Sequence, residues 1–151
     1  MSDRQVLPLI NRGSFTYANP GLIHWSAGCV AERLTDGIDQ LDGRRVFLVT
    51  TRRIAGNPNL LGPLRRLLGN HLVGIYLKVR QHTPARDVVA ATAAAREARS
   101  DLLLSLGGGS AIDAAKAVAF SLVTSLNLTD PNLPSRAQDL GAMLGMLHVV
   151  W

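Results

Sequence analysis

The sequence has few of the residues that crosslink a chain or bind metals. It has one cysteine among 151 residues, so no disulfide can form within the chain, and nothing near Cys29 has metal-ligand spacing. A small buried hydrophobic residue is the favoured interpretation of Cys29. Three of the four histidines, His24, His71 and His148, have no carboxylate at metal-ligand spacing. The sequence therefore predicts no metal site in this chain.

Long apolar runs and long basic runs are also missing. No stretch reaches the roughly 18 uninterrupted apolar residues that cross a bilayer, and the N-terminus lacks a signal-type apolar core, so we expect a cytoplasmic protein without a membrane partner. Lys and Arg outnumber Asp and Glu by 16 to 11, which gives a net charge of +5. No basic run exceeds two residues and aromatics do not interleave, so nucleic acid is not the expected partner. A phosphate-rich small molecule would use the same charge.

Apolar and helical segments alternate through the chain, whose length and 47% hydrophobic content fit one folded domain over 1–151. Buried strands followed by helices predict an α/β fold, a Rossmann-like doubly wound parallel sheet. The predicted strands are 45–51, 72–79, 101–106 and one that begins near 147; the predicted helices are 26–41, 59–68, 85–99 and one from Ser110. Short apolar segments at 6–10, 15–17 and 22–25 predict an N-terminal hairpin or edge strands.

The apolar run at 101–106 leads directly into four small residues, Gly107, Gly108, Gly109 and Ser110. Glycines let the backbone turn sharply and approach a ligand without a Cβ in the way. Asp113 follows Ser110 at capping-box spacing, which predicts that a helix starts with Ser110 as its N-cap. A strand, a glycine loop and a helix N-terminus together form an anion site, most often for phosphate. The alternative is a structural turn, because the loop matches neither the Walker nor the GxGxxG pattern.

Ligands of doubly wound sheets bind beyond the carboxyl ends of the strands. Three loops converge at this edge, 51–56, 81–84 and 107–110. The third loop carries the glycines. In the second, Thr83 and Pro84 predict a helix start, with Thr83 as the N-cap and proline at the first helical position.

The whole string SLGGGSAIDAAKAVA resembles the signature of the iron-containing, metal-dependent alcohol dehydrogenase superfamily, which includes maleylacetate reductases and glycerol dehydrogenases. The resemblance implies the N-terminal cofactor-binding domain of such an enzyme, with the glycine loop, Gly107 to Ser110, around the pyrophosphate of NAD(P). Asp113 and Lys116 match the GGGSxxDxxK pattern of the family, and the resemblance places Asp113 among the cofactor-binding residues. Their spacing also fits an i, i+3 pair on a helix, and a structural role is favoured for both.

The same resemblance implies NADP in preference to NAD. Relatives often carry an aspartate for the adenosine ribose where this chain has Thr51, followed by Arg52 and Arg53. Without the aspartate there is no negative charge to repel a 2′-phosphate, and the two guanidinium groups can bind one. The alternative is that both arginines are solvated loop charges. His82 and Thr83 lie where relatives place a turn that lines the cofactor cleft, and His82 is either a nucleotide contact or an ordinary surface histidine.

Family members also have a helical C-terminal domain whose aspartate and histidines bind iron or zinc. We expect that domain to be absent here and to belong to a longer enzyme or a separate chain, so that this chain binds cofactor but is incomplete for catalysis. The alternative is a non-catalytic nucleotide-binding or oligomerising module with the same fold. A last strand that ends at Trp151 would leave apolar surface, which predicts a homo-oligomer.

Overall fold

The computed structural model describes residues 12–17, 21–124 and 146–149, and the chain divides into two compact units, Met1–Leu34 and Thr35–Trp151. The first unit contains β1 (Arg12–Tyr17) and β2 (Gly21–Ser26), an antiparallel pair. The predicted N-terminal hairpin is thus confirmed, while the apolar segment 6–10 lies outside the described residues. Helix α1 (Cys29–Gln40) follows within the predicted range.

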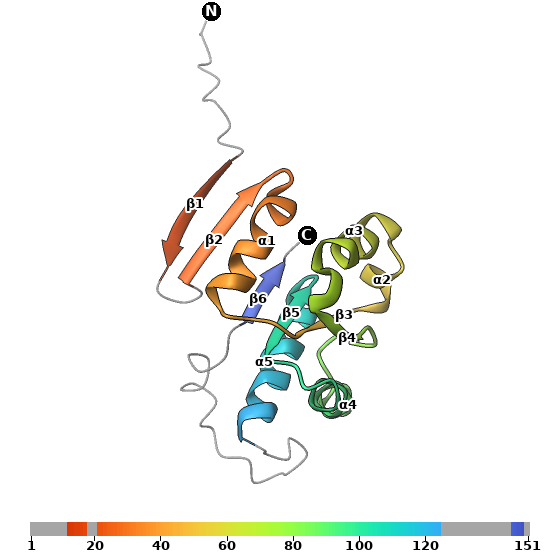
Figure 1. Ribbon diagram of the computed structural model, residues 1–151. Helices are drawn as coiled ribbons and strands as arrows, with labels where there is room; N and C mark the ends of the chain where they lie inside the picture. The colour runs from red at the N-terminus through yellow and green to blue at the C-terminus, as the bar shows by residue number, and fades with distance from the viewer. Residues whose placement is uncertain (1–11, 18–20, 125–145, 150–151) are drawn as a thin grey trace, which may run out of the picture. The chain divides into compact units, whose positions relative to one another are not determined.

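The second unit contains a parallel sheet of four strands in the order β4-β3-β5-β6 (Figure 1). The strands are β3 (Val46–Thr50), β4 (Leu72–Tyr76), β5 (Leu102–Leu106) and β6 (Met146–Val149). Each lies within or close to an apolar run of the sequence. The expected α/β architecture with a parallel sheet is therefore confirmed.

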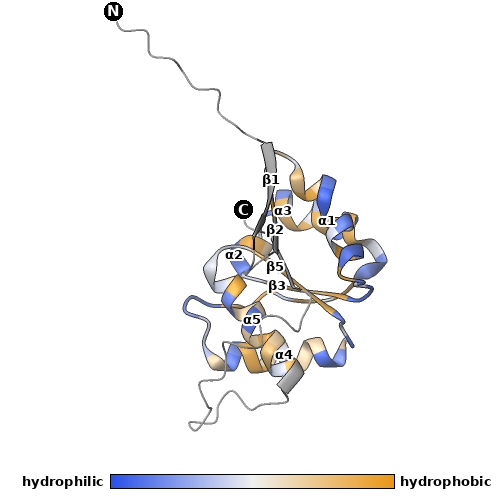
Figure 2. Cartoon of the chain, turned by 90° about the vertical axis from the view of Figure 1, so that its left-hand side faces the viewer, coloured by the Kyte–Doolittle hydropathy of each residue, from blue (hydrophilic) through white to orange (hydrophobic). Residues whose placement is uncertain are grey.

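The helices cover both faces of this sheet. Between β3 and β4 lie α2 (Arg52–Ala55), α3 (Pro58–Leu68) and the 3-10 turn η1 (Gly69–His71); α4 (Ala85–Glu97) precedes β5 and α5 (Gly109–Thr124) follows it. The chain moves outward from β3 to β4 and then back past β3 to β5, so right-handed crossovers place α3 on one face and α4 and α5 on the other. Figure 2 shows this separation, with β3 and β5 between the two layers.

The core lies between β3, β5 and the pair α4–α5. All five residues of β3 and of β5 are buried, as expected for central parallel strands covered on both sides. Phe47 and Leu103 pack against alanines of the two helices, such as Ala91 and Ala115. Small side chains let the helices lie close to the sheet. Of the two adjacent valines of α4, Val88 is buried, whereas Val89 is 43% exposed.

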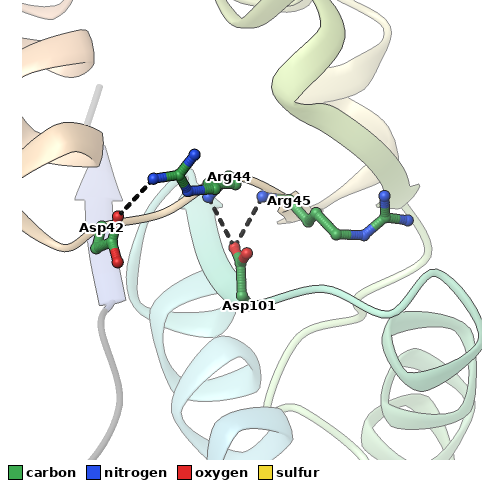
Figure 3. Close-up of polar contacts among 4 residues, drawn as sticks. All are labelled: Asp42, Arg44, Arg45 and Asp101. Carbon is green, nitrogen blue, oxygen red and sulfur yellow. Dashed lines mark hydrogen bonds and ion pairs between the residues drawn. The ribbon is translucent and has the colours of Figure 1, made fainter.

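Asp101 ties the amino-terminal ends of β3 and β5 together (Figure 3). Its carboxylate accepts hydrogen bonds from the backbone N–H groups of Arg44 and Arg45, at 3.0 and 2.8 Å. The Arg45 side chain in turn donates to the carbonyl oxygens of Ala98 and Arg99 at the end of α4. Carbonyls at the end of a helix have no partner within it, so this arginine supplies one.

We expect Asp101→Ala to lower the free energy of unfolding by about 1–2 kcal/mol, because two backbone donors lose a charged acceptor. Asp42→Asn is the control, because Asp42 has a φ of 49°, which asparagine tolerates and alanine does not. Its ion pair with Arg44 is highly exposed, with 79% and 88% of the two side chains accessible, so the change should stay within about 0.5 kcal/mol. Urea unfolding followed by circular dichroism measures both. Equal losses in the two variants would contradict the role given to Asp101.

Candidate functional site

A cleft of about 1160 Å³ opens at the carboxyl ends of β3, β4 and β5. This is the edge at which a doubly wound sheet binds its ligands. Its walls come from the segment after β3, from the end of β4 with the loop that follows, and from the start of α5. The lining residues are Thr51, Arg52, Arg53, Ile54, Asn57, Leu60, Tyr76, Lys78, Val79, Arg80, Gln81, Asp87, Gly108, Ser110 and Ala111.

Thr50, the last residue of β3, connects these walls. Its hydroxyl is buried and donates to the Leu106 carbonyl oxygen at 2.7 Å, at the point where the glycine loop begins. Its own carbonyl oxygen accepts from the Val79 N–H at 3.4 Å. The ends of three segments are thus fixed by one residue. The sequence pattern did not identify it, because a threonine at the end of an apolar strand has no distinctive signal.

The two glycines that follow Leu106 differ in what they require. Gly107 has φ of 141°, and a Cβ there would lie 3.2 Å from the Ala111 Cβ, so the fold itself needs glycine. Gly108 lines the cleft, and a Cβ at this position would meet no atom within 4 Å. The protein interior therefore does not demand glycine at 108. A ligand that approaches the backbone closely would demand it.

Helix α5 begins two residues earlier than an N-cap at Ser110 predicts. Gly109 is its first residue, and the Gly108 carbonyl oxygen accepts from the Ile112 N–H at 3.2 Å, so Gly108 occupies the N-cap position. The interpretation of Ser110 as the N-cap with Asp113 in a capping box is therefore wrong. Ser110 lies in the first turn and lines the cleft, whereas Asp113 is exposed further along α5 and is not among the lining residues.

Thr51, Arg52 and Arg53 line the cleft from the β3 side. The predicted loop here is instead the short helix α2, capped by the Thr51 hydroxyl oxygen, which accepts from the Ile54 N–H at 3.3 Å. A β-region threonine before a turn of helix is a common cap. Both arginines are exposed, and neither has an acidic partner in the part of the chain that the structure describes.

The loop after β4 forms the opposite wall. His82 and Thr83 both have positive φ, 61° and 44°, which is uncommon for residues other than glycine and unusual for a β-branched one. Thr83 is therefore not the N-cap of α4: Pro84 takes that position in extended conformation, and the Thr83 hydroxyl donates to the Ser110 carbonyl oxygen at 3.1 Å. His82 is exposed and does not line the cleft.

An ion pair between Arg80 and Asp87 holds this loop, and the sequence analysis missed it. Asp87, in the first turn of α4, accepts from the Arg80 backbone N–H at 3.1 Å and from its Nε at 2.9 Å, while Nη2 contacts the other carboxylate oxygen. The Asp87 side chain is only 6% exposed. Hydrogen bonds from Arg80 hold the pKa of Asp87 below its usual value of 3.8, against the opposing effect of burial.

The cleft carries a surplus of positive charge. Four cationic side chains line it, Arg52, Arg53, Lys78 and Arg80, against the single carboxylate of Asp87, which Arg80 neutralises. Burial raises the pKa of the nearby Tyr76, and the negative charge of Asp87 adds to the effect, so this phenol stays neutral. Three unneutralised cations and the N-terminus of α5 make the cleft suited to an anion with several charges.

Within residues 12–17, 21–124 and 146–149, no group of three or more His, Cys, Asp and Glu side chains is placed to hold a metal ion. No helix among these residues is long and apolar enough to span a membrane.

A sequence model of iron-containing alcohol dehydrogenases matches residues 20–142. The chain belongs to the iron-containing alcohol dehydrogenase family. Maleylacetate reductase of Sphingobium indicum is 34% identical to this family member over 103 residues, which are 68% of this chain and 28% of that protein. The chain therefore spans little more than a quarter of that relative's length.

Solved structures show the same relationship for this dehydrogenase-family chain. Maleylacetate reductase from Agrobacterium tumefaciens superposes with a TM-score of 0.57 and 31% identity over 66% of this chain and 27% of that one. Sulfoacetaldehyde reductase from Bifidobacterium kashiwanohense, solved in complex with NAD+, gives a TM-score of 0.59 over 65% of this chain and 26% of that one. At 18% identity, the second likeness concerns the fold alone.

The lowered pKa of Asp87 predicts how stability depends on pH. Because the folded-state pKa is below the unfolded one, the ion pair contributes fully above about pH 4, and its contribution is lost as the pH falls through the lowered folded-state value. We expect Asp87→Asn to cost about 1–3 kcal/mol of unfolding free energy at neutral pH. This difference from the wild type should shrink towards zero in strong acid.

Urea unfolding of both proteins at a series of pH values measures the difference. Asp113→Asn is the control, because Asp113 is an exposed carboxylate on α5 and its replacement should change the free energy by less than about 0.5 kcal/mol. A cost for Asp87→Asn that is the same in acid as at neutral pH would contradict the assignment.

Proposed function

We propose that this family member binds a nicotinamide dinucleotide in the cleft, as the cofactor-binding part of a metal-dependent oxidoreductase that acts on alcohol and carbonyl groups. The observation that carries the proposal is the open space at Gly108, beside the N-terminus of α5 and in a cleft with three unneutralised cations. Pyrophosphate needs a close backbone approach and positive potential, and both are present at this position. Membership of the iron-containing alcohol dehydrogenase family supports the choice of ligand.

In this proposal the glycine loop, Gly107 to Ser110, holds the pyrophosphate. Gly107 makes the turn possible, Gly108 leaves room for the phosphates, and Gly109 begins the helix whose N-terminus faces them. Thr83 acts on this loop indirectly through its bond to Ser110. His82 and Asp113 lie outside the cleft lining, so their suggested cofactor contacts have less support.

The proposed ligand is NADP(H) in preference to NAD(H). The end of β3 carries Thr51 where an aspartate would repel a 2′-phosphate, and Arg52 and Arg53 follow at the rim of the same cleft. Guanidinium groups without a carboxylate partner are suited to bind a phosphomonoester. A bound NADP(H) would supply or accept a hydride at the nicotinamide ring, while the residues of this chain bind and orient it.

The described residues do not form a metal site, so no step of the reaction is assigned to a metal here. We propose that the iron or zinc of the enzyme is bound by another domain or by a separate chain. We also propose that the chain self-associates, because β4 is an edge strand of the described sheet and all five of its residues are half-buried. Light scattering over a wide concentration range tests the second point.

Calorimetric titration of the full chain with NADPH and NADH tests the cofactor site. We expect saturable binding, tighter for NADPH, that Gly108→Leu weakens at least about tenfold because the new side chain fills the space for the pyrophosphate. Lys116→Leu is the control. It places the same side chain at an exposed position further along α5, which does not line the cleft.

An equal loss of affinity in the two leucine variants would contradict the assigned site, as would the absence of binding in the wild type. Detectable NADP(H) turnover, when alcohols or ketones and iron or zinc are added, would favour the oxidoreductase over a non-catalytic nucleotide-binding module.

A further inference from the structure

The loop after β4 is held from three directions. Val79, only 5% exposed, donates its N–H to the Thr50 carbonyl oxygen, and Arg80 is bound to Asp87 through its backbone and its guanidinium group. Thr83 closes the loop against α5 through the Ser110 carbonyl oxygen. The strained backbone of His82 and Thr83 is kept in place by these contacts.

Lys78 is presented by this loop. It precedes the buried Val79, so its side chain lies on the opposite side of the backbone, where it is exposed and lines the cleft. In the part of the chain that the structure describes, no acidic side chain pairs with it. Lys78 is therefore a free cation on the β4 wall.

Arg80 cannot take the same role. Its Nε and Nη2 both contact the Asp87 carboxylate, which neutralises its charge and occupies these two donors. The free cations of the cleft are then Lys78 on one wall and Arg52 and Arg53 on the other. Tyr76, the last residue of β4, lines the cleft on the same wall as Lys78.

We propose that Lys78 is a specificity-determining residue that binds the 2′-phosphate of NADP(H) together with Arg52 and Arg53. Arg80 and Asp87 form a positioning pair that keeps Lys78 at the cleft. This inference rests on the proposed function. A phosphomonoester between a lysine on one wall and two arginines on the other matches the charge of the site.

The test compares the affinities of NADPH and NADH for the full chain and its variants by calorimetry. We expect Lys78→Met to weaken NADPH binding about tenfold and NADH binding less than about twofold, since only NADPH carries the 2′-phosphate. Lys116→Met is the matched control: this lysine is exposed on α5 and does not line the cleft, so both affinities should be unchanged.

The paired change of Arg80→Met with Asp87→Asn tests the positioning pair, because it leaves the net charge of the cleft unchanged. It should reduce the preference for NADPH as Lys78→Met does, and adding Lys78→Met to the paired change should cause no further loss of selectivity, because the changes act on the same contact. A purely structural role for Asp87 would lower thermal stability or weaken both cofactors equally, without changing their ratio. Lys78→Met alters only an exposed side chain and should fold normally. The cofactor affinities of this variant therefore test the role of Lys78 even if the paired variant does not fold.

An unchanged NADPH-to-NADH ratio in Lys78→Met, with normal binding in the wild type, would overturn this inference and leave the cofactor site intact. Additive losses when Lys78→Met is combined with the paired change at Arg80 and Asp87 would overturn the positioning role of that pair. Absence of binding in the wild type would overturn the proposed function, and this inference with it.

Discussion

Thr50 lies where three segments of the cleft meet, and its two hydrogen bonds decide how they are arranged. A hydroxyl that is fully buried must find a partner, and the Leu106 carbonyl oxygen at 2.7 Å satisfies it. This bond fixes the end of β5, so the turn at Gly107 starts from a defined point. The Thr50 carbonyl oxygen fixes the opposite wall through Val79. The cleft is therefore formed by the ends of buried strands.

Electrostatics then select what can enter. The Asp87 carboxylate is paired with Arg80, so these two charges cancel. The remaining charge of the cleft is positive and comes from Arg52 and Arg53 of α2 and from Lys78. The N-terminus of α5 adds its unpaired N–H groups at the same edge. The overall charge of +5 indicates only that an anionic partner is suitable. The clustering of positive charge in the cleft indicates a ligand with several negative charges, such as a polyphosphate.

Apolar runs were sufficient to predict β3, β5 and the parallel architecture, because central strands buried on both faces have few polar residues. The glycine string was sufficient for the family. Contacts between segments were not predictable. Asp87 pairs with Arg80 across a turn whose positive φ values at His82 and Thr83 have no counterpart in the sequence pattern. Serine is a common N-cap residue, which is why the sequence predicts Ser110 as the N-cap. Glycine is also accepted at that position, and α5 starts at Gly109 with Gly108 as its N-cap.

We propose that the glycine loop and the two walls around it bind a phosphate-rich cofactor. Amide chemical shifts of the ¹⁵N-labelled chain, followed during titration with NADP+, test this binding site. We expect saturable shifts at residues 51–54, 78–81 and 107–111, with the hairpin residues 12–17 and 21–26 unaffected. Shifts that are absent, or that cluster on the hairpin while the glycine loop stays unchanged, would contradict it.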